Sequence, residues 1–150
     1  MYMVSACLLG FNCKYNGENN LNADVLRWLG NRPVIAVCPE VFGGLPVPRR
    51  ACEIRPDTGG VEALDRVVTG DGADLTAEFE RGADACVALA RMNQVEAVIL
   101  KQRSPSCGCG QIYDGGFSGR LIPGNGITAR RLIKAGFKVF SEDALPAQSS

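Results

Sequence analysis

The chain has 150 residues, the size of one ordinary domain, with 46% hydrophobic and 21% charged residues. This balance is typical of a folded globular protein and excludes a disordered one. Lys and Arg number 16 and Asp and Glu also number 16, so the formal net charge is zero. Binding to duplex nucleic acid depends on an excess of basic side chains. We therefore expect a small-molecule partner and no duplex nucleic acid.

No apolar run approaches the roughly 20 residues that a membrane span needs. The longest candidates, Val34–Cys38 and Val95–Leu100, have the length of strands. The first residues lack the basic and extended apolar regions of a secretion signal. We therefore expect a cytoplasmic protein with no membrane partner.

Strand-like and helix-like segments alternate along the first half of the chain. Asn22 is a suitable N-cap for the first helix and Gly30 a suitable stop. Residues 41–58 are rich in Gly, Pro and Arg and predict a long loop, which at this length is often functional. The expected elements are a strand over Met3–Cys7, a helix over Ala23–Leu29, a strand over Val34–Val37, and a hairpin or edge strand over Val61–Thr69.

The second half continues the alternation. Apolar residues recur every three or four positions along its long helix, so one face of that helix should meet the core. The expected elements are a helix from Asp74 or Thr76 to Asn93, a strand over Val95–Leu100, a turn-rich stretch over Gln102–Asn125, a helix from Asn125 or Thr128 to Gly136, and a strand over Lys138–Ser141. This order predicts one α/β domain over residues 1–150, Rossmann-like, with a mostly parallel sheet and helices on both faces.

The chain contains seven Cys and no His. An odd number of cysteines without an export signal argues against a disulfide framework. The absence of His excludes Cys–His and Ser–His nucleophile pairs and every mixed Cys/His zinc site. Any metal site must therefore use thiolate or oxygen ligands, and any general base must be a carboxylate, Lys, Tyr or Cys.

Three cysteines follow the ends of expected parallel strands. Cys7 ends the first strand, Cys38 follows the second, and Cys107 lies in the turn-rich stretch after Val95–Leu100. In this fold class ligands bind beyond the carboxyl ends of the strands, so the three thiols should converge at one edge of the sheet. Dispersed thiolates without a paired Cys-x-x-Cys spacing suit a [4Fe–4S] cluster with one open iron better than zinc.

The other cysteines have weaker signals. Cys86 lies on the apolar face of the long helix and is expected to be a core residue. Cys13 and Cys52 lie in expected loops near the site. Each of them is either an alternative ligand or an incidental thiol. Cys109 follows Cys107 by two residues and is a rival ligand.

Several short motifs occur in order along the chain. They are Ser5–Gly10 with Cys13–Gly17, Cys38–Glu40 with Gly43–Leu45 and Pro48–Arg49, Lys101 with Ser104–Gly108, Tyr113–Gly115 with Phe117, and Gly124–Gly126 with Ala129. Together these motifs resemble those of one family, the bacterial thiouracil desulfidases. The resemblance spans nearly the whole chain, and its Ser-Pro-Ser-Cys-Gly element is specific. Lys14 and Asn16 depart from the Arg and Asp that the family often carries, which affects local loop contacts only.

The resemblance implies an oxygen-sensitive [4Fe–4S] cluster on Cys7, Cys38 and Cys107, and a desulfuration with no net redox change. The sulfur of a thiolated base such as 2-thiouracil would bind the open iron. Glu40 would activate a water to attack the C=S carbon, and Ser104 would hydrogen-bond to the ring or pass it a proton. The products would be a uracil-like base and hydrosulfide. Iron–sulfur assembly machinery would be a further partner.

Other functions remain open at this point. The chain could be a non-catalytic iron–sulfur carrier or redox sensor, or a dehydratase-like lyase that uses an open iron. It could also be a nucleotide-binding module with Gly124–Gly126 as a phosphate cradle at a helix start.

Individual site residues also have more than one interpretation. Glu40 could be a loop carboxylate paired with Arg49 or Arg50. Lys101 would be a favourable neighbour of a negatively charged cluster, or a solvated charge at a strand end. Tyr15 and Tyr113 are candidates for stacking on a planar base, or for covering the core.

Overall fold

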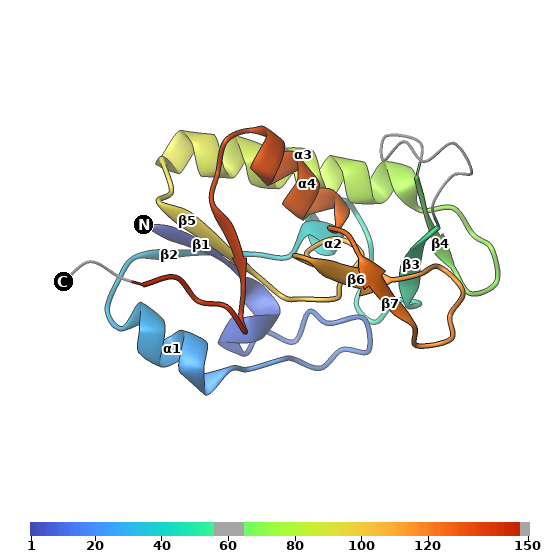
Figure 1. Ribbon diagram of the computed structural model, residues 1–150, viewed down its shortest axis with the longest axis horizontal. Helices are drawn as coiled ribbons and strands as arrows, with labels where there is room; N and C mark the ends of the chain where they lie inside the picture. Colours follow the sequence, from blue (N-terminus) through green and yellow to red (C-terminus); the bar gives the residue numbers. More distant parts are fainter. Residues whose placement is uncertain (56–64, 148–150) are drawn as a thin grey trace.

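The computed structural model describes residues 1–55 and 65–147, and a parallel sheet lies at its centre (Figure 1). The sheet has the order β2-β1-β5-β8, with every neighbouring pair parallel. Its two inner strands, β1 and β5, flank the point where the strand order reverses, which is where ligands bind in open α/β sheets. The strands are β1 (Tyr2–Ser5), β2 (Val34–Val37), β5 (Ala97–Leu100) and β8 (Val139–Ser141).

Helices cover both faces of this sheet (Figure 1). Successive residues of a strand point to opposite faces. Met3 accordingly lies in one buried cluster with Cys86 of α3, whereas Val4 lies in another with Val25 of α1. The predicted α/β fold is therefore confirmed. The helices are α1 (Ala23–Leu29) on one face, and α3 (Thr76–Asn93) and α4 (Ile127–Lys134) on the other.

Two antiparallel ribbons lie beyond the carboxyl ends of the parallel strands (Figure 1). Ile54, Phe79 and Ile112 belong to a third buried cluster, which packs both ribbons against α3. Together the ribbons and the sheet edge enclose a space between them. The ribbon strands are β3 (Cys52–Arg55) with β4 (Arg66–Thr69), and β6 (Gln111–Tyr113) with β7 (Leu121–Pro123).

The connections differ from the sequence expectations in three places. The first strand ends at Ser5, and Cys7 lies in a short 3-10 helix, η1 (Ala6–Leu9). The expected loop over 41–58 contains the end of α2 (Pro39–Phe42) and all of β3, and the turn-rich stretch contains β6 and β7. Strands of three or four residues are too short to show a period, and pairing with distant segments stabilises them. Of the hairpin or edge strand expected over Val61–Thr69, the structure contains β4, which pairs with β3 from outside that range, and residues 61–64 lie outside the described residues.

Two glycines allow α2 to approach α3 very closely. A Cβ added at Gly43 would lie 1.9 Å from the carbonyl oxygen of Glu78, and one added at Gly82 would lie 1.9 Å from that of Pro39. Neither position can hold a larger side chain without movement of the backbone. This contact fixes the helix that begins directly after Cys38.

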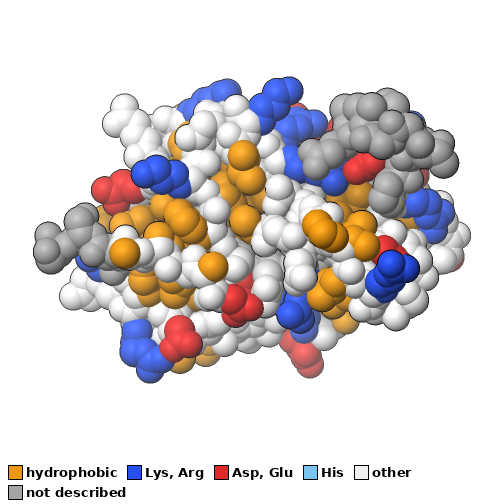
Figure 2. Space-filling model, in the orientation of Figure 1, with side chains coloured by type: hydrophobic (Ala, Val, Ile, Leu, Met, Phe, Trp, Pro, Cys, Tyr) orange, Lys and Arg blue, Asp and Glu red, His pale blue; other side chains and the backbone are white. Residues whose placement is uncertain are grey.

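The surface agrees with the neutral composition. Acidic and basic side chains are both spread over the face shown in Figure 2. Within residues 1–55 and 65–147, none of the helices has the length and apolar character to cross a membrane.

Candidate active site

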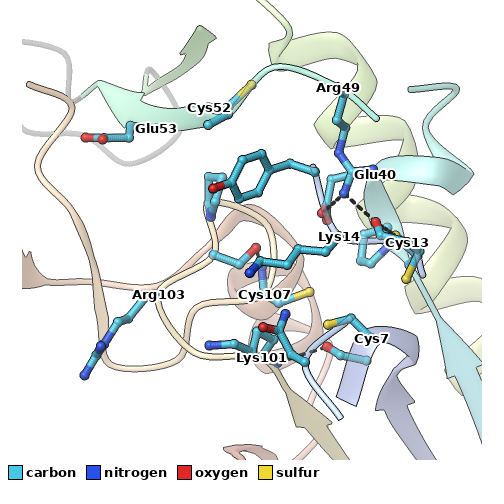
Figure 3. Close-up of a pocket in the computed structure, with 18 of the residues that line it drawn as sticks. Cys7, Cys13, Lys14, Glu40, Arg49, Cys52, Glu53, Lys101, Arg103 and Cys107 are labelled. Carbon is cyan, nitrogen blue, oxygen red and sulfur yellow. Dashed lines mark hydrogen bonds and ion pairs between the residues drawn. The ribbon is translucent and has the colours of Figure 1, made fainter. Parts of the chain in front are cut away.

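A cavity of about 540 Å³ opens between the carboxyl edge of the parallel sheet and the two ribbons. It brings together the three cysteines and the two catalytic residues predicted from the sequence, which come from separate segments of the chain. Tyr15 and Tyr113 also line it. Figure 3 shows Cys7 and Cys107 pointing toward one another, with Glu40 and Arg49 on a neighbouring wall. The predicted residues on its walls are Cys7, Cys38, Glu40, Ser104 and Cys107.

Hydrogen bonds to the backbone carbonyl of Cys7 hold this residue in place. Its carbonyl oxygen accepts from the N–H groups of Gly10 (3.2 Å) and Asn20 (2.9 Å), which anchors η1 and the following loop. Burial raises the pKa of the Cys7 thiol. A hydrogen bond from the Asn20 side chain to the sulfur, and the charge of Lys101, oppose that rise in pKa.

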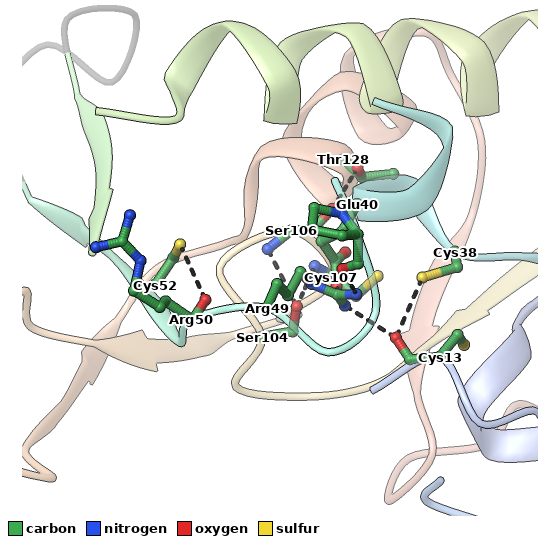
Figure 4. A network of polar contacts seen from close by, with 11 residues as sticks. Cys13, Cys38, Glu40, Arg49, Arg50, Cys52, Ser104, Ser106, Cys107 and Thr128 are labelled. Carbon is green, nitrogen blue, oxygen red and sulfur yellow. Dashed lines mark hydrogen bonds and ion pairs between the residues drawn. The ribbon is translucent and has the colours of Figure 1, made fainter. Parts of the chain in front are cut away.

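Cys38 is the residue that precedes the first turn of α2, and its neighbour in space is Cys13. As a thiol it donates to the Cys13 carbonyl oxygen at 3.7 Å (Figure 4). As a thiolate it accepts from the Cys13 thiol, and this hydrogen bond lowers the pKa of Cys38 to about 7. The same interaction raises the pKa of Cys13, which keeps its proton.

Cys107 lies in a loop that the Ser104 hydroxyl organises. The Ser104 Oγ accepts from the N–H groups of Ser106 and Cys107, both at 3.1 Å. The Ser106 hydroxyl is hydrogen-bonded to that of Thr128 on α4 at 2.7 Å. Burial and the nearby Glu40 carboxylate raise the pKa of Cys107 well above its usual value, and a hydrogen bond from the Ser5 hydroxyl opposes this.

The N-terminus of α4 is hydrogen-bonded to the same loop. The N–H groups of Ile127 and Thr128 donate to the carbonyls of Pro105 and Ser106, each at 2.9 Å, and Gly126 donates to the Gly108 carbonyl at 2.7 Å. These groups would have to bind the phosphate of a nucleotide held at Gly124–Gly126. Because they are already engaged, the nucleotide-binding interpretation of this glycine pair is wrong.

Glu40 and Arg49 form an ion pair at the cavity wall. The Arg49 Nη2 lies 2.8 Å from the Glu40 Oε2 and 3.0 Å from the Cys13 carbonyl oxygen (Figure 4). The Arg49 side chain is 7% exposed and the Glu40 side chain is 16% exposed. The pairing with Arg49 expected as an alternative is therefore present. The other carboxylate oxygen of Glu40, Oε1, is buried and has no hydrogen-bond partner among residues 1–55 and 65–147, so it is available to a ligand.

Lys101 is also held at the cavity, so it is not a freely solvated charge. Its Nζ lies 3.1 Å from the Glu142 Oε2 and donates to the Gln102 carbonyl at 3.1 Å. Glu142 is only 8% exposed. Arg103 also lines the cavity, but its side chain points away from the cysteines (Figure 3).

The remaining cysteines occupy different surroundings. Cys86 is fully buried in the core as predicted, and burial raises its pKa to about 12. Cys52 lies beside Glu53, well away from Cys7 (Figure 3), and burial raises its pKa to about 11. The Cys109 thiol donates to the Val139 carbonyl at 3.7 Å. Cys109 is thus directed toward β8, whereas Cys107 lines the cavity.

A sequence model of the 2-thiouracil desulfurase family matches residues 2–144. The chain belongs to this family. The chain is 40% identical over 147 residues to the uncharacterized protein YbbK of Bacillus subtilis (strain 168), and this match covers 97% of each protein. It is also similar to the solved structure of TudS, a [4Fe-4S]-dependent thiouracil desulfidase. That structure is 43% identical with a TM-score of 0.85, over 97% of this chain and 92% of that one.

Sequence reasoning on this desulfurase-family chain did not single out the side chains that contact the thiols. Asn20 lies in the run Gly-Glu-Asn-Asn-Leu, where nothing distinguishes it from its neighbour Asn19. Ser5 precedes Cys7 by two residues in a recognised motif, which was the one available signal. Cys13 had two open interpretations, and its contact with Cys38 now gives it a defined place.

Proposed function

We propose that this protein removes sulfur from a thiolated nucleobase such as 2-thiouracil and uses a [4Fe–4S] cluster to do so. Family membership and the similarity to TudS support the reaction and the cofactor. The observation that carries the proposal is one cavity lined by five cysteines from distant segments, Cys7, Cys38 and Cys107 among them, and by an ion-paired carboxylate. One oxygen atom from water replaces one sulfur atom, so the products are a uracil-like base and hydrosulfide, and no electrons are transferred.

We propose that Cys7, Cys38 and Cys107 hold the cluster. Soft thiolates are the ligands that iron–sulfur clusters take. In the described part of the chain, no group of three or more His, Cys, Asp or Glu side chains is arranged to hold a single metal ion. A cluster fits this better, because each cysteine binds a different iron and the ligands therefore lie farther apart than around one ion.

Three protein ligands leave one iron open, and this iron supplies a Lewis acid for the soft sulfur of a C=S group when the cluster is bound. The ligand thiols must lose their protons for the cluster to bind, so loading releases protons. The pKa of Cys7 and that of Cys107 are raised by burial, which makes this release costly in the empty protein. We propose that iron–sulfur assembly machinery in the cytoplasm loads the cluster.

Glu40 is the proposed general base. Its Oε2 is fixed by Arg49, and its buried Oε1 is free to accept a hydrogen bond from a water molecule. A water held there would lose a proton to Oε1 as its oxygen attacks the carbon that carries the sulfur. The ion pair with Arg49 keeps the carboxylate in one orientation, so the accepting oxygen does not turn away.

Ser104 is the proposed proton donor to the substrate ring. Its oxygen accepts two backbone N–H groups, so both lone pairs are engaged and the hydroxyl hydrogen remains to be donated. A hydroxyl in this state donates to a ring nitrogen or oxygen. Tyr15 and Tyr113 on the cavity walls offer flat surfaces for a planar base.

The test is anaerobic turnover of 2-thiouracil, with hydrosulfide and uracil both measured. Glu40→Gln should keep the cluster absorbance and lose roughly 10²-fold or more in kcat, the usual contribution of general acid–base catalysis. Glu80→Gln is the matched control, because Glu80 also faces an arginine, Arg131 at 3.9 Å, but lies on α3 outside the cavity. Full activity of Glu40→Gln would show that the assignment of the base is wrong.

The same assay separates the enzyme from the alternatives. A protein with an intact cluster that releases no hydrosulfide from any thiolated base would be a carrier or redox sensor. Water loss from a hydroxylated substrate, without any desulfuration, would identify a lyase of the dehydratase type.

A further inference from the structure

One carboxylate of β3 holds the loop that connects β6 to β7. The Glu53 Oε1 accepts the N–H of Gly115 at 3.0 Å and that of Phe117 at 3.2 Å. Hydrogen bonds from backbone N–H groups to a carboxylate are roughly twice as strong as those between neutral groups. Glu53 lines the cavity but lies well away from Cys7 (Figure 3), so its carboxylate acts on this loop and not on the thiols.

Gly115 allows the same loop to lie directly on β3. It is buried, its φ is +91°, and a Cβ added to it would lie 2.7 Å from the Ile54 carbonyl oxygen. Asp114 closes the loop: its Oδ1 accepts the N–H of Gly116 at 2.8 Å, and its own N–H donates to the Arg120 carbonyl at 3.0 Å. The two ribbons are therefore joined here, and the residue that follows is placed by both.

Phe117 is that residue, and its backbone is strained. Its φ is +55°, in the left-handed region that side chains other than glycine rarely adopt. Its ring lies beside Gly70, directly after β4, since a Cβ added at Gly70 would be 3.7 Å from the ring atom Cδ1. Phe117 is nevertheless 37% exposed and lines the cavity. A ring that only filled the space between the ribbons would be covered and would need no strained backbone, so the exposed part of this ring calls for a function.

We propose that Phe117 is a substrate-binding residue whose ring packs on the flat face of the thiolated pyrimidine, and that Glu53 is a positioning residue that holds this ring in place. The inference rests on the proposed function and adds to it the residue that contacts the ring of the base. Stacking on an aromatic side chain uses the π-face of a base. It therefore acts on substrate, transition state and product alike, so it contributes to binding and not to the chemical step.

The test uses the cluster-loaded protein and measures kcat and KM for 2-thiouracil, together with the Kd of uracil by isothermal titration calorimetry. Phe117→Ala should raise the KM and the uracil Kd, each on the order of tenfold, and leave kcat unchanged. Phe117→Tyr keeps the ring and should match the wild type. Phe117→Leu keeps an apolar side chain without a flat ring and should behave like Phe117→Ala. The matched control is Phe11→Ala, which removes a phenylalanine that is 56% exposed and lies outside the cavity, and it should change none of the three constants.

A second set of variants tests the role of Glu53. Glu53→Ala removes the acceptor of both N–H groups, so it should raise the KM and the uracil Kd while kcat stays the same. Glu53→Gln keeps an oxygen that accepts these N–H groups and should recover wild-type binding. Because Glu53 acts through Phe117, the double variant Glu53→Ala/Phe117→Ala should bind uracil no more weakly than Phe117→Ala alone.

The outcomes distinguish this inference from the proposed function. A wild-type protein that releases no hydrosulfide from 2-thiouracil would contradict the proposed function. A wild-type protein that turns over normally, with an unchanged KM and uracil Kd in Phe117→Ala, would contradict the inference alone. Lower thermal stability in Phe117→Ala and Glu53→Ala without weaker uracil binding would do the same, because it would show a role in packing only. Losses of binding that add in the double variant would contradict the positioning role of Glu53.

Discussion

The close contact between α2 and α3 determines where Cys38 and Glu40 lie, and Gly82→Ala tests it. The new Cβ would lie 1.9 Å from the Pro39 carbonyl oxygen, whereas real Cβ atoms essentially never approach closer than 3.0 Å. The separation must grow from 1.9 Å to at least 3.0 Å, so α2 has to move by about 1 Å relative to α3. Pro39 lies between Cys38 and Glu40, so both site residues move with it.

Two effects of opposite sign act on stability. In an open helix interior, replacing Gly by Ala stabilises by about 1 kcal/mol. At Gly82 the overpacking against a backbone carbonyl costs about 1–3 kcal/mol, and no side chain can rotate away to relieve it. We expect a lower melting temperature, and a fall in kcat on the order of 10²-fold, since a displacement of about 1 Å has that effect on catalysis.

The assay combines thermal unfolding by circular dichroism with anaerobic turnover of 2-thiouracil, normalised to iron content. Ala88→Ser adds one atom at an exposed position of the same helix and is the control. It should cost only about 0.5 kcal/mol of helix propensity and leave turnover unchanged. A Gly82→Ala protein with a higher melting temperature and wild-type turnover would refute the reasoning.

Three further changes test separate parts of the structure. Gly126→Ala would place a Cβ 2.4 Å from the Ser106 carbonyl oxygen, so the loop that carries Cys107 should move and the iron bound per chain should fall; wild-type iron content would contradict this. Asn22→Ala removes the N-cap of α1 and should cost about 1 kcal/mol in urea unfolding. The Thr76 hydroxyl and backbone N–H hold the pKa of Asp74 below its usual 3.8. Above pH 3.8 the ionised Asp74 carboxylate therefore stabilises the fold, and this stabilisation is lost as the pH falls through the lower pKa of the folded protein. Asp74→Asn should therefore destabilise the protein at pH 7 and have no effect at low pH.

The sheet and its helices could be predicted because their signals are local. The strand over Val34–Val37 and the helix over Ala23–Leu29 match the structure residue for residue, since an apolar run, an N-cap and a terminal glycine all lie within the segment. The position of the site also followed from the order of elements. Parallel strands bring their carboxyl ends to one edge, and the residues after β1, β2 and β5 line the same cavity.

The contacts made by the site residues could not be predicted in the same way. Arg49 was one of two expected partners of Glu40, but the choice between it and Arg50, and the contact of Cys38 with Cys13, depend on loops whose paths are set by packing against the ribbons. β3 and β6 are too short to show a period and exist because their partner strands lie alongside. The close approach at Gly82 leaves no sequence signal beyond a glycine in a helix.

The central claim is that three particular thiols hold one cluster, and the direct measurement is iron and sulfide content after anaerobic purification. We predict about four iron and four sulfide per chain in the wild type, the content of one [4Fe–4S] cluster, and the same in Cys52→Ser and Cys109→Ser. Cys7→Ser, Cys38→Ser and Cys107→Ser should each lose most of both. A full complement of iron in any of these three, or its loss in Cys109→Ser, would contradict the account.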